Sequence, residues 1–175
     1  MKKDIKEYIR TIPDFPEKGI MFRDITSVLN DADGLRLAID LMEEKAKKYD
    51  FDLIVGPESR GFIFGVPIAY NLYKPFAPVR KKGKLPSETV SVEYDLEYGT
   101  AVLEMHKDAI KKGQKVLIVD DLMATGGTIE AITKLVESLG GEVVAGIFLI
   151  ELKGLKGREK FKNFPVETII SYEGK

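Results

Sequence analysis

Apolar residues occur along the chain in two patterns, short unbroken runs and stretches in which they recur every three or four positions. Unbroken runs are typical of strands buried on both faces of a parallel sheet. The spaced stretches predict amphipathic helices. Their alternation predicts an α/β fold in which a central, mainly parallel sheet with right-handed crossovers is flanked by helices. The predicted strands cover 53–55, 76–79, 116–119 and 143–150, with an edge strand at 166–170.

The helical stretches are less uniform than the strands. Pro13, Pro16 and Gly19 predict an extended connection after the first helix. Pro67 lies inside the third helix, where it should kink the helix or shift its start. Alternating β-formers at 88–94 and 99–105 predict a hairpin. The predicted helices are 2–12, one that starts at 30–33 with Leu35, Ala38, Leu41, Met42 and Ala46 facing inward, one that ends near Leu72, a brief one at Ala109 and Ile110, and 129–139.

Composition narrows the class of protein. A chain of 175 residues has the length of a single domain with one core. Lysine and arginine number 27 against 28 acidic residues, so no strongly basic surface predicts nucleic-acid binding. No apolar run reaches the ~20 residues of a membrane span, and the N-terminus lacks the apolar region of a signal peptide. We therefore expect a cytoplasmic protein without nucleic-acid or membrane partners. The absence of cysteine excludes disulfides and thiolate metal sites.

The stretch from Val116 to Thr128 carries the strongest chemical signal. A buried strand is followed by Asp120 and Asp121, then by Gly126 and Gly127 between two threonines, and then by a helix. Glycines let successive N–H groups point at one spot, and the helix N-terminus adds positive potential there. This turn therefore predicts a site for an anion of phosphate size, to which the Thr125 and Thr128 hydroxyls can also donate.

The two aspartates indicate what else the ligand carries. A bare phosphate would be repelled by them, whereas a vicinal diol offers two donors to their carboxylates. A phosphate and a cis-diol together describe a 5-phosphoribosyl group. A P-loop requires a lysine after its last glycine, where Thr128 stands here. A dinucleotide-binding turn has its acid about twenty residues after the glycines. An ordinary strand–turn–helix with the acids as surface caps is the remaining alternative.

The pattern of apolar strand, paired acids and Thr-Gly-Gly-Thr resembles the phosphoribosyl-pyrophosphate signature of type I phosphoribosyltransferases. Five further segments, in the same order, resemble the adenine-specific members of that family. They are 20–25 (IMFRDI), 58–62 (ESRGF), 80–86 (RKKGKLP), 96–99 (LEYG) and 155–159 (LKGRE).

The resemblance implies one domain over 1–175, with a base-binding hood at 1–30 and a flexible lid loop at 80–99. It implies transfer of the phosphoribosyl group to adenine, giving AMP and pyrophosphate, with Mg²⁺ held mainly by substrate and water, near Asp120 and Asp121. A homodimer is implied as well. Ligands in such sheets bind outside the carboxyl ends of the strands, so the loops after Val55, Val79 and Val119 should converge.

The resemblance also implies a role for each group of residues. Asp120 and Asp121 would stabilise positive charge on the ribose ring, and cations would stabilise the leaving pyrophosphate. A closed lid would exclude water. The implied sets are catalytic Glu97, Asp120 and Asp121; phosphoribosyl-binding Asp120, Asp121, Ala124, Thr125, Gly126, Gly127 and Thr128; diphosphate-binding Glu58, Ser59, Arg60, Arg80, Lys81 and Lys84; base-binding Met21, Phe22 and Arg60; and lid residues Glu97 and Tyr98.

Each role has a plainer alternative. The basic segment would also suit solvated surface or an RNA-binding patch, and Glu97 could merely order the closed lid. Phe22 could be a core anchor and Arg60 a surface ion pair, whereas Phe15, Phe62 and Phe64 are expected in the core and His106 as structural or solvated. Transfer to an oxopurine or orotate lacks a matching lysine motif. A nucleic-acid-binding regulator would require a basic face or an added domain.

Overall fold

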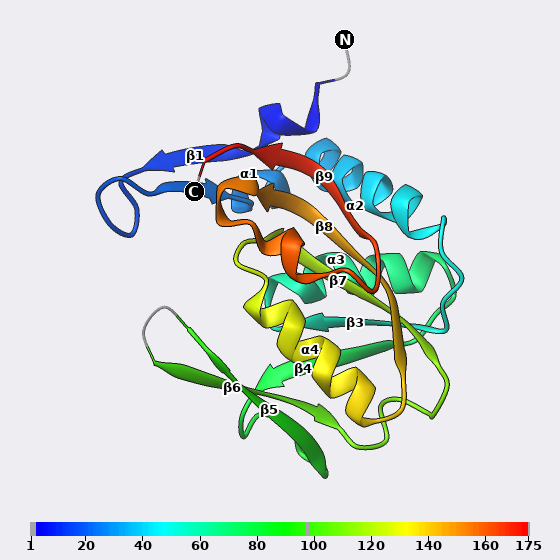
Figure 1. The fold of residues 1–175 in the computed structure, drawn as a ribbon. Coiled ribbons are helices and arrows are strands. Elements are labelled where there is room, and N and C mark those ends of the chain that lie inside the picture. The colour runs from blue at the N-terminus through cyan, green and yellow to red at the C-terminus, as the bar shows by residue number, and fades with distance from the viewer. Residues whose placement is uncertain (1–2, 97–98, 175) are drawn as a thin grey trace.

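The computed structural model describes residues 3–96 and 99–174. Within them, the main sheet has the order β5-β6-β4-β3-β7-β8-β9 (Figure 1). Strands β4, β3, β7, β8 and β9 run parallel, and β6 joins β4 in antiparallel pairing with β5 outside it. This confirms the predicted α/β architecture with a mainly parallel central sheet. The bounds are β3 Leu53–Pro57, β4 Phe76–Lys81, β5 Thr89–Asp95, β6 Thr100–His106, β7 Lys115–Met123, β8 Glu142–Leu152 and β9 Val166–Tyr172.

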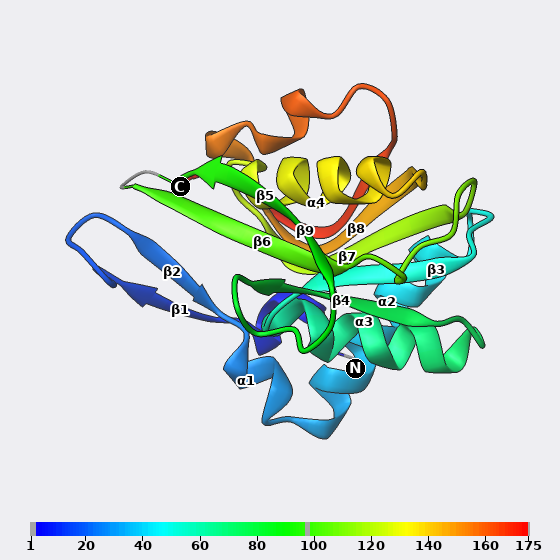
Figure 2. The same ribbon diagram turned by 90° about the horizontal axis from the view of Figure 1, so that it is seen from below.

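Helices cover both faces of this sheet. Figure 2 shows α2 and α3 on one face and α4 on the other. Asp31 caps α2 by accepting the N–H groups of Asp33 and Gly34, as an N-cap aspartate does. The helices are α1 Thr26–Leu29, α2 Ala32–Ala46, α3 Arg60–Asn71 and α4 Gly127–Ser138, with short 3₁₀ turns η1 Ile5–Tyr8, η2 Lys153–Leu155 and η3 Gly157–Lys160.

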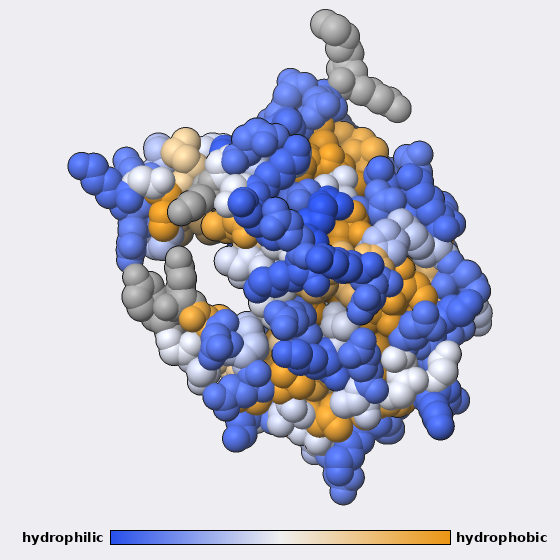
Figure 3. Space-filling view, in the orientation of Figure 1, coloured by the Kyte–Doolittle hydropathy of each residue, from blue (hydrophilic) through white to orange (hydrophobic). Residues whose placement is uncertain are grey.

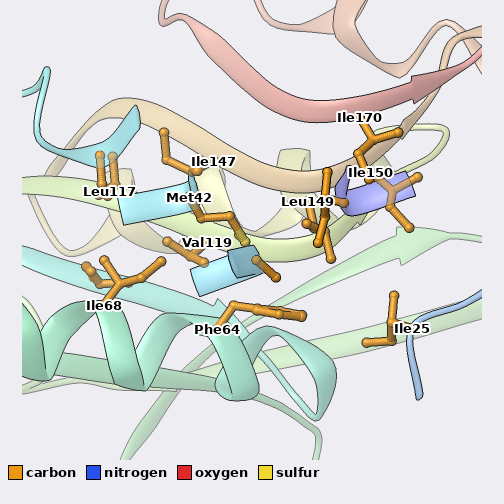
Figure 4. Packing of buried hydrophobic residues seen from close by; sticks show 14 of the residues in the cluster. Ile25, Met42, Phe64, Ile68, Leu117, Val119, Ile147, Leu149, Ile150 and Ile170 are labelled. Atoms are coloured by element: carbon orange, nitrogen blue, oxygen red, sulfur yellow. The ribbon is translucent and has the colours of Figure 1, made fainter. Parts of the chain in front are cut away.

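The core consists of two hydrophobic clusters, one on each side of the sheet. One lies beneath α2 and α3 and includes Phe64, Ile68 and Leu117 (Figure 4). The other lies beneath α4 and includes Ile132 and Val116. The run Val116–Val119 contributes to both clusters and is fully buried, which confirms the strand predicted from its apolar, β-branched character.

The described part of the predicted N-terminal helix, residues 3–12, forms a short helical turn and a strand instead. Asp4 and Glu7 make a capping box, but the helical turn η1 ends at Tyr8. Residues β1 Arg10–Pro13 then pair antiparallel with β2 Met21–Asp24. The prediction of a helix over 2–12 was wrong, because a partner strand and β-branched Thr11 and Ile12 outweigh a weak helical pattern. We call β1, β2 and the loop between them the N-terminal hairpin, residues 10–24.

Other differences are local. Ala109 and Ile110 form a turn, because Gly113, with φ +84°, reverses the chain before any helix can extend. Pro67 lies inside α3 without shifting its start. Leu35 and Leu41 are only half-buried, whereas Ala38, Met42 and Ala46 are fully buried as predicted.

The predicted hairpin at 88–105 and the edge strand at the C-terminus are confirmed. Phe64 lies in the core and Phe62 is half-buried, but Phe15 is 49% exposed, so its predicted core position was wrong. His106 is half-buried and accepts a long hydrogen bond from the Ser87 N–H. No helix among residues 3–96 and 99–174 is long and apolar enough to span a membrane.

Candidate active site

The turn between β7 and α4 forms a cavity of about 200 Å³. The predicted phosphoribosyl residues come together there, joined by Arg60 from α3. One expectation about the turn was wrong: the strand does not end at the aspartates but continues to Met123, because β8 supplies paired residues up to Glu151. The lining consists of Arg60, Asp120, Asp121, Leu122, Met123, Ala124, Thr125, Gly126, Gly127, Thr128 and Ile129.

Gly126 allows the chain to enter α4 at this point. Its φ is +83°, a left-handed conformation that side chains rarely adopt. A Cβ there would also lie 3.0 Å from the Gly157 carbonyl oxygen. Among the described residues, no side chain caps the start of this helix. Its first N–H groups lack intrahelical acceptors, and the helix dipole favours an anion beside them.

The paired carboxylates lie in different environments. The Asp121 Oδ2 lies 3.0 Å from the Arg60 Nε, although Asp121 itself is buried. Asp120 Oδ1 accepts the backbone N–H of Asp121 at 2.8 Å. Burial and the neighbouring charge of Asp121 raise the pKa of Asp120 well above its usual range. The cavity therefore holds one carboxylate paired with a cation and a second whose ionised form is disfavoured.

Two glycines allow the end of β3 and the start of α3 to approach β7 closely. A Cβ at Gly61 would lie 2.7 Å from Pro57 and 3.1 Å from the Asp120 Oδ1. A Cβ at Gly56 would lie 2.8 Å from the Val119 carbonyl oxygen. Larger residues would push the loop after β3 away from β7. The peptide between Glu58 and Ser59, which leads into α3, is cis.

Among the predicted diphosphate residues, those of the basic segment gather around the carboxylate of Glu58, whereas Arg60 pairs with Asp121. The Glu58 Oε1 accepts the Lys81 N–H at 2.7 Å, and its Oε2 lies 2.7 Å from the Lys84 Nζ. The Arg80 Nε lies 3.5 Å from Oε1. Burial raises the pKa of Glu58, but the hydrogen bonds from Lys84 and from the Lys81 backbone outweigh it, so the pKa is lowered.

These contacts confirm that the segments after Val55 and Val79 converge. The ion pair between Arg60 and Asp121 brings the segment after Val119 to the same place. The structure also corrects a boundary, because Arg80 and Lys81 belong to β4 rather than to the following loop. The neighbouring strand β6 holds them there, pairing Arg80 with Glu104 and Lys81 with Leu103.

The predicted base-binding residues lie on the N-terminal hairpin. Met21 is 41% exposed, and the Phe22 ring meets the Phe15 ring edge-on at 5.1 Å between centroids. Figure 3 shows an open recess between the N-terminal hairpin and the β5–β6 hairpin, on the side where both project from the molecule. Phe22 is thus not a core anchor. Arg60 does not lie in the hairpin but pairs with Asp121.

The predicted lid residues Glu97 and Tyr98 lie outside the described residues. The stem of that hairpin is described, and it packs on α4. A Cβ at Gly127 would lie 3.7 Å from the Tyr94 Cδ2. The strand that leads to residue 96 therefore touches the helix N-terminus that borders the cavity.

Residues 157–158 pack against the turn between β7 and α4 and support it, a role that the sequence did not predict. A Cβ at Gly157 would lie 2.2 Å from the Ala124 carbonyl oxygen, so only glycine fits there. Arg158 forms a bidentate pair with buried Glu151, at 2.9 and 2.6 Å, and also donates to the Val166 carbonyl. The Gly-Arg pair was visible in the sequence, but Ala124, against which Gly157 packs, is distant in the chain.

Comparisons with known proteins agree with this geometry. The family model described as "Phosphoribosyl transferase domain" matches residues 25–172. A protein of Lachnoclostridium phytofermentans named adenine phosphoribosyltransferase is 69% identical over 173 residues, covering 99% of each chain.

Two solved structures are similar as well. An adenine phosphoribosyltransferase of Thermoanaerobacter pseudethanolicus matches with a TM-score of 0.92 at 56% identity, covering 96% of this chain and 98% of its own. The enzyme of Saccharomyces cerevisiae, solved with adenine and an imino-altritol bisphosphate, matches with a TM-score of 0.86 at 42% identity, covering 93% and 94%.

Proposed function

The chain belongs to the phosphoribosyl transferase domain family, and from this premise we propose how its residues transfer a 5-phosphoribosyl group from phosphoribosyl pyrophosphate to adenine. The products are AMP and pyrophosphate. The observation that carries the proposal is the cavity at the β7–α4 turn, where paired carboxylates face an uncapped helix N-terminus. The relative that is 69% identical and named adenine phosphoribosyltransferase supports adenine as the acceptor.

The sugar-phosphate is bound at the two ends of this cavity. The 5-phosphate lies among the first N–H groups of α4 and accepts hydrogen bonds from Thr125 and Thr128. The ribose hydroxyls donate to Asp120 and Asp121. As the bond from C1 to pyrophosphate weakens, the ribose ring gains positive charge, which these carboxylates stabilise.

The leaving pyrophosphate gains negative charge in the same step. Arg80, Lys81 and Lys84 stabilise it, from a segment that Glu58 already holds in place. Arg60 and Ser59 border the same region at the start of α3. The Arg80 and Lys84 side chains and the Lys81 backbone are tied to the half-buried Glu58 carboxylate, so this segment is preorganised, which distinguishes it from a solvated basic loop.

Mg²⁺ fits this site chiefly as an ion that binds together with the substrate. Among the described residues, no three His, Asp or Glu side chains gather as a metal-binding group. Asp120 and Asp121 are the oxygen donors near the sugar, and Mg²⁺ commonly keeps several waters in such a role. When bound, the ion neutralises pyrophosphate charge.

The nitrogen of adenine attacks C1, and the nitrogen proton must then leave. The lid, residues 80–99, excludes water during this step, with Glu97 as its acid–base residue and Tyr98 beside it. The N-terminal segment, residues 1–30, forms the hood over the base, with Phe22 stacking on the purine and Met21 presenting backbone groups. These assignments rest on the resemblance, together with the exposed position of the hairpin.

We also infer a homodimer in the cytoplasm. The outer side of α3 and the turn after it expose several apolar side chains close together, which is typical of an interaction surface. Val66 is 47% exposed, Tyr70 84% and Tyr73 97%. We name these three residues the α3 surface and propose that it meets a second copy.

A direct assay tests the reaction. The protein is incubated with Mg²⁺, phosphoribosyl pyrophosphate and, separately, adenine, hypoxanthine, guanine or xanthine, and the nucleotides are separated by chromatography. We expect AMP and pyrophosphate from adenine and little product from the other bases. Asp121→Ala should lower kcat by about 10²-fold or more while the protein stays folded, since a transition-state contact is lost. Faster reaction with hypoxanthine would overturn the choice of base, and a fully active Asp121→Ala would overturn the ribose role.

A further inference from the structure

Arg23 connects the N-terminal hairpin to the far end of the chain. It follows Phe22 on β2 and lies opposite Thr11 of β1, whose Oγ1 accepts from the Arg23 Nη1 at 2.6 Å. The centre of the guanidinium, Cζ, lies 3.8 Å from the centre of the Tyr172 ring. A guanidinium at this distance over an aromatic face makes a close cation–π contact.

Tyr172 is held firmly by the main sheet. It ends β9 in register with Leu152 of β8 and packs against the core cluster beneath α2 and α3. Figure 1 shows β9 ending beside the N-terminal hairpin. The Lys6 Nζ, from η1, lies 5.7 Å from the same ring. One ring of the sheet thus receives two cations from the first thirty residues.

The contact is more than a chance surface pair. The Arg23 Nε is buried and has no hydrogen-bond partner among the described residues. Desolvating a guanidinium nitrogen without a partner costs free energy, which the stacking on Tyr172 offsets. The hairpin therefore has one preferred position on the sheet, set by this ring.

The direction of the side chains makes the contact relevant to the base. Neighbouring residues of a strand point to opposite faces, so the side chain of Phe22 lies on the face opposite to Arg23. While Tyr172 holds one face of β2, the ring of Phe22 remains available on the other, next to Phe15. When Arg23 is held in place, the position and orientation of the Phe22 ring are therefore held as well.

We propose that Tyr172 is a positioning residue for the purine: its ring holds Arg23 and so sets the place of Phe22 and Met21 relative to the phosphoribosyl cavity. This inference rests on the proposed function, because it assumes that the hairpin binds the base. Tyr172 itself touches neither substrate nor reacting atoms.

Three variants test the contact. Tyr172→Leu removes the aromatic face but keeps an apolar side chain, and Tyr172→Phe keeps the face as a matched control. Thr11→Val removes the other tether of Arg23 with little change in shape. Hydrogen exchange of residues 10–24 is measured by mass spectrometry, with residues 127–138 of α4 as internal reference, and KM is measured for both substrates.

We expect faster exchange over 10–24 in Tyr172→Leu, with α4 unchanged. KM for adenine should rise about five- to twentyfold, as the loss of a partly buried cation–π contact implies, while KM for phosphoribosyl pyrophosphate stays within about twofold. Thr11→Val should show a smaller change in the same direction, and Tyr172→Phe should behave as wild type.

Each contrary result has its own meaning. Unchanged exchange in Tyr172→Leu would show that the ring does not hold the hairpin. Faster exchange with an unchanged KM for adenine, or an equal rise of both KM values, would overturn the positioning role. Failure of the wild-type protein to use adenine at all would instead refute the proposed function, and the exchange experiment would still report on the contact.

Discussion

Asp120 occupies a position that favours its neutral form, although the proposed reaction uses its charge. Its carboxyl is buried beside Asp121, and both conditions raise its pKa. A folded-state pKa above the unfolded value means that the folded protein binds the extra proton. The contribution of Asp120 to stability is therefore fully present below the ordinary carboxyl pKa of about 4 and is lost as pH rises through the folded value.

Asp120→Asn should remove the loss of stability that ionisation of Asp120 causes at high pH. We expect its melting temperature to exceed that of the wild type at pH 8, by about 2–4 °C for each kcal/mol relieved, with the difference shrinking towards pH 4. Its kcat should fall at least about tenfold, because one carboxylate near the ribose is lost. Calorimetry at several pH values checks the first expectation. Asp108→Asn, which changes an exposed carboxylate, is the control, and a difference that does not depend on pH would contradict the explanation.

At the scale of elements, the phosphate turn depends on a segment thirty residues further along the chain. Gly157 lies against the Ala124 carbonyl, and Arg158 ties the same segment to Glu151 at the end of β8. The turn thus rests on η3 as well as on its own glycines. Its shape is set by tertiary packing in addition to local conformation.

Gly157→Ala should displace that turn. The added Cβ would lie 2.2 Å from the Ala124 carbonyl oxygen, a distance that backbone atoms can relieve only by moving. We expect KM for phosphoribosyl pyrophosphate to rise by about tenfold or more, since a misplacement of about 1 Å can cost 10²-fold. Steady-state kinetics measures the effect. Gly174→Ala, whose Cβ would meet nothing within 4 Å, should be neutral, and wild-type kinetics for Gly157→Ala would show that the turn does not need this support.

Elements differed in how well the sequence predicted them, for physical reasons. The run 116–119 and the helix after it could be predicted because burial on both faces and a clear helical spacing leave one interpretation. Residues 10–13 could not, because a strand of four residues depends on its partner at 21–24. At the site, the local turn was predicted from its glycines and acids. The contacts between Gly157 and Ala124 and between Arg23 and Tyr172 join distant positions, and one sequence gives no sign of such pairs.

At the scale of the whole molecule, the α3 surface is the feature that a single chain leaves unexplained. Tyr70 and Tyr73 are far more exposed than tyrosines that contribute to a core. Rigid aromatic side chains of this kind are enriched where proteins associate.

Replacing both tyrosines should separate the copies. We expect the wild-type protein to elute as a dimer in size-exclusion chromatography with light scattering, and Tyr70→Glu/Tyr73→Glu to elute as a folded monomer, because charges on both sides of the interface repel. Lys48→Glu, on the exposed side after α2, serves as the charge-changing control. A wild-type monomer, or a dimer that persists in the double variant, would place the association elsewhere or remove it.

The ion pairs between Glu58 and the basic segment affect how pyrophosphate binds and leaves during turnover. An incoming pyrophosphate group meets Arg80 and Lys84 already paired with the Glu58 carboxylate, so its affinity reflects the difference between its own attraction to these two cations and that of Glu58. When pyrophosphate leaves, the Glu58 carboxylate pairs with these cations again. We expect Glu58 to hold the basic segment in one conformation between reaction cycles and to make pyrophosphate easier to release.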